Sequence, residues 1–430
     1  MVKYDMKLRA GAGLRVRRAD INDLPRMAEV FAAARRYMAA NGNPSQWGDK
    51  SPDLALVKED IKLGDSYVVT DGNGRIVATF ALMKRPDPHY ANIYDGPGWV
   101  ESPVPYMTLH RVATDGSVRG MMPMIFGWAA TCCDHLRIDT HADNATMLRQ
   151  IEHAGFSFRG IVTMDDGTPR RAFQRITTSE MTAADITECL VSQQNERQRI
   201  ILSRFFKTGK GEYGEGDRFL GLKVPQTRVV VREAKLKMTL PEIAELMKSE
   251  WHEMRLAGLL LLVEEMNAAL PKRGKDTPEL ALRRRLILDL YLRNAHRANN
   301  WDLVDLSAPY IVGNYLLASL PDGALPPTDL LDRLAADTNL WRQRIAIVST
   351  ATLIRAKRFD DTLRIALKLL SHPHDLIHKA TGWMLREVGK RDLNVLLAFL
   401  DTHHASMSRT TLRYAIERLS PAQRRHYLGL

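Results

Sequence analysis

A glycine-rich segment in the middle of the chain combines residue types that can bind phosphate. It spans residues 205–228 and contains five glycines together with Lys207, Lys210, Tyr213 and Arg218. Backbone N–H groups left open at glycines, with cationic side chains nearby, form a concave site for an anion. The segment therefore indicates a phosphate-binding turn, and the alternative is an ordinary connection between two helices.

Histidines and cysteines offer a second kind of chemistry, metal binding, but their spacing does not favour it. His372, His374 and His378 include a pair four residues apart, yet no carboxylate or cysteine completes a ligand set. His252 and Glu253 lack the second histidine of a zinc protease motif. The three cysteines form neither a disulfide framework nor a zinc-ligand pattern. We therefore expect no metal site.

The charge balance favours an acidic or polyanionic partner. Lysine and arginine total 61 against 50 aspartates and glutamates, which gives a net charge of +11. Residues 1–178 carry 23 basic and 20 acidic side chains, whereas residues 179–430 carry 38 and 30, so most of the excess lies in the second part. A basic surface of this kind can follow a nucleic acid, although a solvated basic face without a partner is the alternative.

The first part of the chain alternates strand and helix signals. In residues 67–83, two runs rich in valine, isoleucine and threonine flank Asp71-Gly72-Asn73-Gly74, which predicts a hairpin because these turn residues tolerate positive φ. Helices are expected over residues 21–41 and near 122–135. We predict an α/β (α+β) domain with a central mixed sheet over residues 1–178.

From about Thr182 onward, strand signals almost vanish and apolar residues recur at helical spacing. Three segments, around Arg255, Arg344 and His378, each place a basic residue two positions before an alanine, at intervals of 89 and 34 residues. Such intervals are compatible with helical-hairpin repeats of irregular length. We predict an all-α, HEAT-like helical-repeat solenoid over residues 179–430, in preference to a generic helical bundle.

The glycine-rich segment closely resembles the opening of the DNA alkylation repair family of HEAT-like glycosylases, and the resemblance covers about 235 residues to the C-terminus. It implies a catalytic cleft and a DNA-binding surface. The implied catalytic residues are Trp301, Asp305, Arg344 and Trp383. The implied DNA-binding residues are Lys207, Lys210, Tyr213 and Arg218. Trp301 and Asp305 share one helix face because they are four residues apart, whereas Asp302 points elsewhere.

The resemblance also implies a reaction, the release of alkylated purines such as 7-methylguanine and 3-methyladenine from double-stranded DNA. A purine alkylated at a ring nitrogen is already cationic, so it leaves as a neutral base and positive charge develops on the deoxyribose. Asp305 would stabilise that charge and orient water, the tryptophans would contact the sugar, and Arg344 would hold a flanking phosphate. No cofactor and no lysine nucleophile are needed, so we expect a monofunctional glycosylase.

Residues 107–162 resemble the core of the GNAT N-acetyltransferases, and the likeness extends over roughly 175 residues. It implies that the strand MTLHRVAT splays to admit acetyl-CoA. The implied cofactor-binding residues are Val112, Ala113, Arg119, Gly120 and Asn144. Two features depart from the family pattern. Met122, Pro123 and Met124 stand in the pyrophosphate loop, where small residues are usual, and Ile151 stands where many members have a tyrosine acid.

These features predict a cytoplasmic, nucleoid-associated repair glycosylase with an appended acetyltransferase-like domain. The expected partners are duplex DNA with alkylated bases and, for the first domain, acetyl-CoA; no metal and no membrane are expected. Two alternatives stay open. The helical domain can grip DNA without catalysis, or acetyl-CoA-dependent N-acetyl transfer can be the main activity, with the helical domain as a DNA- or protein-binding module.

Overall fold

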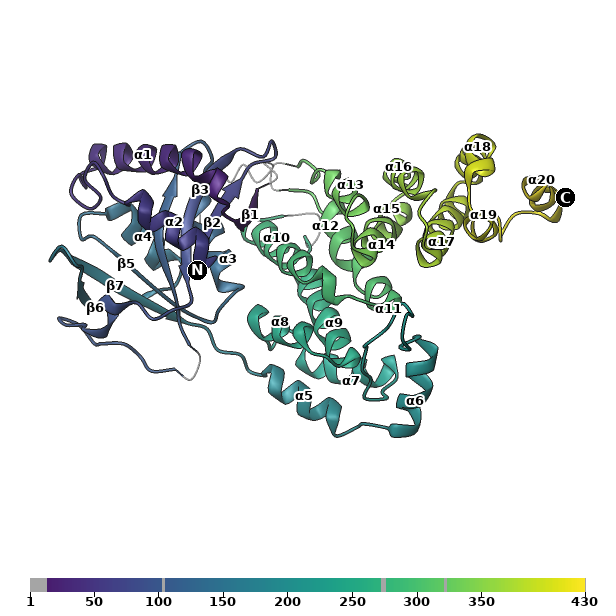
Figure 1. Cartoon of the computed structure of the whole chain (residues 1–430), viewed down its shortest axis with the longest axis horizontal. Coiled ribbons are helices and arrows are strands. Elements are labelled where there is room, and N and C mark those ends of the chain that lie inside the picture. The colour runs from purple at the N-terminus through teal and green to yellow at the C-terminus, as the bar shows by residue number, and fades with distance from the viewer. Residues whose placement is uncertain (1–13, 103–104, 272–275, 321–322, 430) are drawn as a thin grey trace. The chain divides into compact units, whose positions relative to one another are not determined.

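The computed structural model describes residues 14–102, 105–271, 276–320 and 323–429, and its internal contacts divide the chain into two compact units (Figure 1). Unit 1 holds the residues up to Ser179 together with Thr239–Pro241, and unit 2 holds Glu180–Met238 and Glu242–Leu430. The first 13 residues of the predicted N-terminal domain lie outside the described part. No helix in the described ranges is both long and apolar enough to cross a bilayer.

Unit 1 contains a seven-stranded sheet in the order β1-β2-β3-β4-β5-β7-β6. Its strands are β1 (Arg15–Arg18), β2 (Ser66–Thr70), β3 (Ile76–Met83), β4 (Met107–Thr114), β5 (His135–Thr140), β6 (Ser157–Thr163) and β7 (Pro169–Ile176). Only the β4–β5 pair is parallel; the other neighbours run antiparallel. The mixed sheet predicted from the sequence is confirmed.

Four helices accompany the sheet of unit 1. They are α1 (Leu24–Ala40), α2 (Leu54–Leu63), α3 (Met121–Ala130) and α4 (Ala145–His153). Met27, Val30 and Phe31 of α1 pack against Val68 and Ile76 of the sheet, and burial of such apolar side chains is the main stabilising term in a fold of this kind.

Local sequence explains two boundaries in unit 1. The predicted hairpin is confirmed, because Asp71 N–H donates to the Arg75 carbonyl at 2.9 Å and Gly74 takes a φ of +82°. The helix predicted to reach residue 135 stops earlier, at Ala130. The Thr131 hydroxyl bonds back to the Trp128 carbonyl at 2.7 Å, and the following residues enter β5.

Unit 2 is built from helices. They are α5 (Ala183–Val191), α6 (Glu196–Phe205), α7 (Val224–Ala234), α8 (Leu240–Lys248), α9 (His252–Ala268), α10 (Pro278–Arg293), α11 (Trp301–Asp305), α12 (Asn314–Leu317), α13 (Asp329–Ala335), α14 (Leu340–Val348), α15 (Thr350–Arg355), α16 (Asp360–Leu369), α17 (Asp375–Arg391), α18 (Leu393–His403), α19 (Arg409–Ala415) and α20 (Pro421–Leu428). A π-helical turn, Pro309–Gly313, precedes α12.

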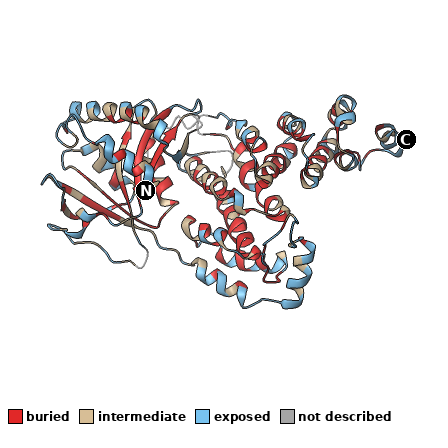
Figure 2. Ribbon diagram, viewed as in Figure 1, coloured by how far each residue is buried: buried red, intermediate tan, exposed pale blue. Residues whose placement is uncertain are grey.

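The three segments that suggested a repeat all form helices of unit 2: α9, α14 and α17. Each carries buried side chains toward its neighbours, and α9 is buried almost all round, so it forms the centre of this unit (Figure 2). Helices that follow each other in the chain pack together, as α13 with α14 and α17 with α18 do, and α14 also packs on α17. The prediction of an all-α helical-repeat unit is confirmed.

Candidate functional site

The predicted catalytic pair lies on α11, a helix of only five residues. Such a short helix is unstable alone, and it forms here because the buried side chain of Asn300 accepts the Trp301 N–H at 2.9 Å as an N-cap. Trp301 and Asp305 stand at its two ends, four residues apart, and both are half-buried. The cap thus fixes the direction in which both side chains leave the turn.

Asp305 forms a two-pronged ion pair with Arg344 of α14. Nε and Nη2 of Arg344 donate to Oδ1 and Oδ2 of Asp305 at 3.0 and 2.8 Å, and Nη1 donates to the Leu376 carbonyl of α17 at 2.7 Å. Each nitrogen of Arg344 therefore binds a protein oxygen, and its side chain is only 6% exposed. The phosphate contact expected of Arg344 does not fit this burial; the arginine instead fixes the orientation of Asp305.

The environment of Asp305 is set by burial and by Arg344. Burial raises the pKa of Asp305 above its ordinary value, and the Arg344 guanidinium opposes that rise. A two-pronged arginine contact needs two acceptor oxygens, which is the ionised form of the carboxyl group. With 17% of its side chain exposed, Asp305 remains accessible as a carboxylate held in one orientation.

Trp301 stands in a row of aromatic rings. Its ring lies 5.4 Å from Phe206 and 6.0 Å, edge to face, from Phe205, and Phe205 is 60% exposed. Phe206 in turn stacks on Phe219 at 5.2 Å. Exposed aromatic rings next to a buried aromatic core are a surface on which a sugar or a base can pack. The sequence analysis did not single out Phe205 or Phe206.

A buried network of charged side chains contacts α11, and the sequence analysis did not predict it. Nε2 of His252 lies 3.0 Å from Oδ2 of Asp302, and Nδ1 lies 2.9 Å from Oδ2 of Asp217. Arg255 forms an ion pair with the other oxygen of Asp217. Asp302 thus binds a buried partner, apart from Trp301 and Asp305 as expected, and ties α11 to α9.

The two carboxylates keep His252 protonated. Burial acts to lower the pKa of His252, but Asp302 and Asp217 together raise it to about 9. The imidazolium ring also stacks on Phe219 at 4.4 Å and lies 5.1 Å from Phe206, the ring that packs on Trp301. His252 therefore supports the start of α11 in two ways, through Asp302 and through the aromatic row that packs on Trp301. No single sequence pattern marks this contact, because its three charged members come from separate segments.

The glycine-rich segment differs from a phosphate-binding turn. The buried carboxylate of Glu253 accepts the N–H groups of Leu220, Gly221 and Leu222 at 2.9, 2.9 and 3.1 Å. Other N–H groups of the segment bind Glu212, Glu215 and the Lys207 carbonyl. Backbone N–H groups that are already bonded cannot serve an outside anion, so four of the five glycines, Gly209, Gly211, Gly214 and Gly221, do not form the predicted cradle, and the segment is a wall anchored to α9 through Glu253.

The four residues predicted to bind DNA lie in different surroundings. Lys207 and Lys210 are exposed. Arg218 is exposed but pairs with Glu250 at 2.7 Å and stands 4.3 Å above the Trp251 ring. Tyr213 is half-buried, edge-on to the Trp341 ring at 6.4 Å. The lysines are therefore open for contact with a partner, whereas Arg218 and Tyr213 are engaged within unit 2.

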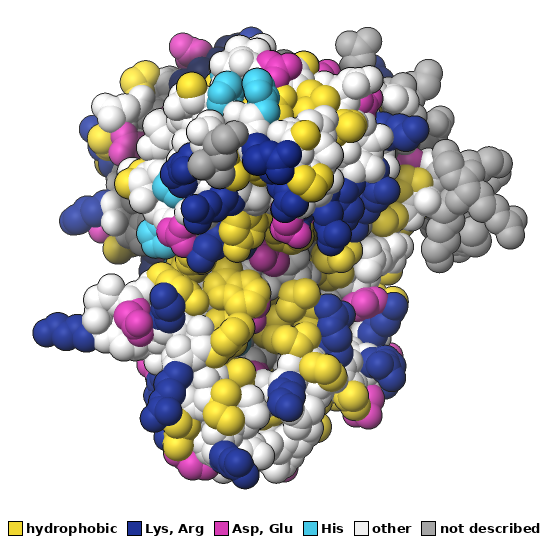
Figure 3. Space-filling model, turned by 90° about the vertical axis from the view of Figure 1, so that its right-hand side faces the viewer, with side chains coloured by type: hydrophobic (Ala, Val, Ile, Leu, Met, Phe, Trp, Pro, Cys, Tyr) yellow, Lys and Arg dark blue, Asp and Glu magenta, His cyan; other side chains and the backbone are white. Residues whose placement is uncertain are grey.

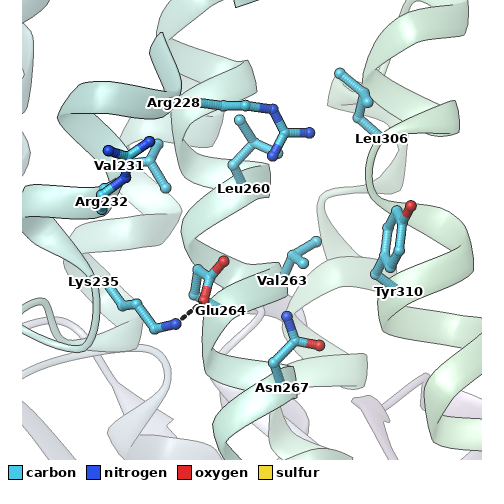
Figure 4. A pocket seen from close by; sticks show the side chains of 10 residues that line it. All are labelled: Arg228, Val231, Arg232, Lys235, Leu260, Val263, Glu264, Asn267, Leu306 and Tyr310. Atoms are coloured by element: carbon cyan, nitrogen blue, oxygen red, sulfur yellow. Dashed lines mark ion pairs between the residues drawn. The ribbon is translucent and has the colours of Figure 1, made fainter. Parts of the chain in front are cut away.

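A basic groove lies between α7, α9 and the residues that follow α11, with a volume of about 460 Å³ (Figure 4). It is lined by Arg228, Val231, Arg232 and Lys235 of α7, by Leu260, Val263, Glu264 and Asn267 of α9, and by Leu306 and Tyr310. Lys235 pairs with Glu264 across the groove. Arg228 and Arg232 have no ion-pair partner within the described ranges. Leu306, which directly follows Asp305, lines the same groove as these two arginines.

Trp383, the fourth predicted catalytic residue, is half-buried on α17, the helix whose Leu376 carbonyl binds Arg344. The structure thus joins α11, α14 and α17 through one arginine.

On the face drawn in Figure 3, where helices of unit 2 lie, hydrophobic side chains gather in a hollow with lysine and arginine side chains around it. Such a surface suits a ligand with apolar and anionic parts.

The histidines weighed as metal ligands are engaged elsewhere. Nε2 of His372 lies 2.9 Å from the Gln343 side-chain oxygen, and His378 binds the His372 carbonyl. His374 accepts the Leu376 N–H as the N-cap of α17. In the described parts of the chain, no group of three His, Cys, Asp or Glu side chains is placed to hold a metal ion.

In unit 1, β4 separates from β5 partway along its length. The parallel pairing covers only Met107–Leu109 of β4, although the strand runs on to Thr114. Just after this point, the segment from His110 to Ala113 of β4 pairs with the segment from Thr79 to Ala81 of β3, so β4 has one residue more than its partner. Within this segment Arg111 takes a φ of +51°. This β-bulge turns the strand. Val112 and Ala113, two predicted cofactor residues, lie in the part of β4 that no longer pairs with β5.

The other predicted cofactor residues lie at two helix starts. Gly120, with a φ of +77°, is the N-cap of α3, and exposed Arg119 precedes it. No side chain caps α3, so its first N–H groups are available to an anion, although Pro123 at its third position lacks an N–H. Asn144 instead caps α4, accepting the Met147 N–H at 3.1 Å and donating to Gln46 at 2.9 Å, so its side chain is used within the fold.

Solved structures similar to this chain fall into two groups. A GNAT-family acetyltransferase from Streptococcus agalactiae 2603 is 26% identical, covers 40% of this chain and 99% of its own, and has a TM-score of 0.35. A putative acetyltransferase from Salmonella typhimurium, solved with acetyl-CoA, is 15% identical with 39% and 97% covered and a TM-score of 0.27. A predicted DNA alkylation repair enzyme from Enterococcus faecalis is 16% identical, with 53% and 98% covered and a TM-score of 0.40.

None of the curated proteins matches the sequence. The family model described as "DNA alkylation repair enzyme" matches residues 186–419, which is more than half of the 430 residues. The match includes the glycine-rich wall, α11, the basic groove and the helices that carry Arg344 and Trp383. The chain therefore belongs to the DNA alkylation repair enzyme family.

Proposed function

We propose that unit 2 is a DNA glycosylase that hydrolyses the N-glycosidic bond of alkylated, cationic purines such as 7-methylguanine and 3-methyladenine. The observation that carries the proposal is the Asp305 carboxylate, oriented by Arg344 and flanked by the aromatic row that ends in exposed Phe205. A fixed carboxylate next to aromatic faces is suited to a sugar that becomes positively charged.

The reaction needs little acid catalysis. The alkylated base carries its positive charge before the bond breaks, so it leaves neutral, and the deoxyribose takes up the charge as an oxocarbenium ion. Asp305 lowers the energy of that cation and orients the water that attacks it. The faces of Trp301 and Trp383 add attraction worth roughly 0.5–2 kcal/mol each. In this mechanism Arg344 is a positioning residue, because its nitrogens bind Asp305 and Leu376.

DNA phosphates are assigned to free cations. Arg228 and Arg232 line the groove that Leu306 also lines and have no ion-pair partners in the described ranges, and Lys207 and Lys210 are exposed. Each phosphate that such a cation neutralises releases counterions, which favours binding at low salt. The engaged side chain of Arg218 contributes less on this proposal, because a phosphate would have to displace Glu250.

The direct test is release of 7-methylguanine and 3-methyladenine from methylated duplex DNA by the purified full chain. A monofunctional glycosylase leaves abasic sites, so strands should break only after alkali treatment. Release of both bases with intact strands is the expected result. Tight DNA binding without any release would make unit 2 a binding module, and strand cleavage without alkali would contradict the absence of a lysine nucleophile.

A second function, acyl transfer from acetyl-CoA, is proposed for unit 1. The separation of β4 from β5 favours it, because unpaired backbone in a splayed strand can hydrogen-bond an extended arm such as pantetheine. The uncapped start of α3 at Gly120, beside Arg119, fits a pyrophosphate, with one N–H fewer because of Pro123. Titration of the full chain with coenzyme A tests this: no binding, or binding unchanged in Arg119→Glu, would contradict it.

A further inference from the structure

A cluster of polar and aromatic side chains lies in unit 1 where β4 and β5 stop pairing. On β5, Arg137 is 9% exposed, and its guanidinium carbon lies 4.0 Å from the centre of the Trp99 ring and 3.8 Å from that of Tyr106. No described residue provides a carboxylate within ion-pair distance of Arg137, and its Nε has no hydrogen-bond partner. A cation is thus held out of water without a counter-ion.

This arrangement calls for an anionic ligand. Burying an unpaired charge is unfavourable, and the cation–π contacts with two rings offset only part of that penalty. The planar fork of an arginine matches a carboxylate or a phosphate. Two carboxylates nearby, Asp87 and Asp139, disfavour a doubly charged phosphate and leave a singly charged carboxylate as the best match for Arg137.

The neighbouring groups on the same strand suit a cation. Asp139 lies two residues after Arg137, so the two side chains share one face of the sheet, roughly 7 Å apart along the strand. Oδ1 of Asp139 accepts the Tyr90 hydroxyl at 2.8 Å, whereas Oδ2 has no hydrogen-bond partner among the described residues. A negative and a positive side chain therefore stand side by side, each with bonding capacity left over.

His110 of β4 lies beside the carboxylates of Asp87 and Asp139. Its Nε2 lies 2.5 Å from Oδ2 of Asp87, while its Nδ1 is 3.6 Å from Asp139, too far for a hydrogen bond. The contact with Asp87 fixes the tautomer, so that Nδ1 is the nitrogen able to accept a proton. The Tyr90 ring lies between the acidic and the basic side chains of the cluster, 6.0 Å from the His110 ring and 5.1 Å from the Trp99 ring that packs on Arg137.

We propose that unit 1 binds a small zwitterion, an amine that carries a carboxylate, as in an amino acid. Its carboxylate binds Arg137, and its ammonium group contacts both the Asp139 carboxylate and Nδ1 of His110 from one side. His110 accepts one ammonium proton and so frees the amine as a nucleophile. On the acyl transfer proposed for unit 1, on which this last step rests, the amine nitrogen bonds to the acyl carbon, the C–S bond breaks, and the thiolate leaves with the electron pair.

Binding is tested without any acyl donor, so that it stands apart from acyl transfer. The full chain is titrated calorimetrically with the twenty common L-amino acids, their decarboxylated amines and their N-acetyl forms. We expect at least one amino acid to bind, and its amine and its N-acetyl form to bind at least tenfold more weakly. Failure of all twenty to bind, or equal binding of the matched amine, would overturn the proposal.

Two kinds of variant locate the site. Arg137→Met should weaken amino-acid binding at least tenfold, and Arg137→Lys, which keeps the charge without the fork, should weaken it measurably. Arg171→Met is the matched control, because Arg171 also lies over two rings, Phe158 at 5.0 Å and Phe173 at 6.0 Å, away from the cluster. Thermal unfolding of each variant reports whether it keeps its fold; full amino-acid binding by both Arg137 variants would refute the assignment.

Discussion

Replacing Asp305 by asparagine tests the proposed chemistry most directly, because the change removes the charge and little else. A carboxylate about 4 Å from a positive sugar contributes about 4 kcal/mol at an effective dielectric constant of 20. Arg344 offsets part of that attraction, so we expect a loss of about 3–4 kcal/mol in transition-state stabilisation. The rate of base release should fall about 10²- to 10³-fold.

Stability must be separated from chemistry in this experiment. An asparagine keeps one acceptor oxygen for Arg344 but turns an NH₂ group toward a donor, which should cost about 1–3 kcal/mol of unfolding free energy. Asp289→Asn is the matched control, since Arg285 donates to both oxygens of Asp289 at 3.0 Å, with similar exposure, away from the cleft.

The assay is single-turnover release of 7-methylguanine from methylated duplex, with urea unfolding of each variant in parallel. Asp289→Asn should lose comparable stability and keep wild-type release. If Asp305→Asn kept more than a tenth of the wild-type rate, the carboxylate would not be the main stabiliser of the sugar cation. If Asp289→Asn lost as much activity as Asp305→Asn, the effect would be one of stability rather than chemistry.

Three further predictions concern the surroundings of the site. The pKa of His252 is about 9 in the folded protein and 6.5 in the unfolded chain, which should add about 3 kcal/mol to the free energy of unfolding. This stabilisation is fully present below pH 6.5 and is lost as the pH rises through 9. Urea unfolding of wild type and His252→Gln should therefore differ most at low pH, and a pH-independent difference would contradict the prediction. In DNA-binding titrations, Arg228→Glu and Arg232→Glu should each make the slope of log K against log salt less steep by about 1. An unchanged slope would contradict the assignment of DNA phosphates to the groove. Gly221→Ala should destabilise by more than about 2 kcal/mol, since its φ is +91° and a Cβ would meet the Asn195 carbonyl oxygen at 2.1 Å; unchanged thermal unfolding would show that the segment can shift.

Much of the fold follows from local sequence signals. The hairpin around Gly74 and the strand 107–114 are encoded by β-branched residues and turn residues, so they could be predicted without tertiary information. The end of α3 was misjudged because the apolar run of the helix continues into the buried start of β5, and periodicity cannot separate the two.

The site was predictable where one segment carries it and unpredictable where several converge. Trp301 and Asp305 share a helix turn, so their spacing places them together. The role of Arg344 was misjudged because burial decides whether an arginine faces a phosphate or a carboxylate, and burial depends on how α14 packs. The structural role of His252 depends on its contacts with Asp217 and Asp302, which lie 35 residues before it and 50 residues after it in the sequence.

The brevity of α11 has a consequence for local motion. A helix of five residues would fray on its own, yet this one is capped by Asn300, tied through Asp302 to the central helix α9, and continued by Leu306, whose N–H bonds to the Asp302 carbonyl at 2.9 Å. Its amide protons should therefore exchange with solvent only when the core of unit 2 opens, at the slow rate of α9 rather than the fast rate of a surface turn. Asp305 therefore sits on a segment that moves with the core, and on the proposed function the DNA lesion must adapt to the position of this carboxylate.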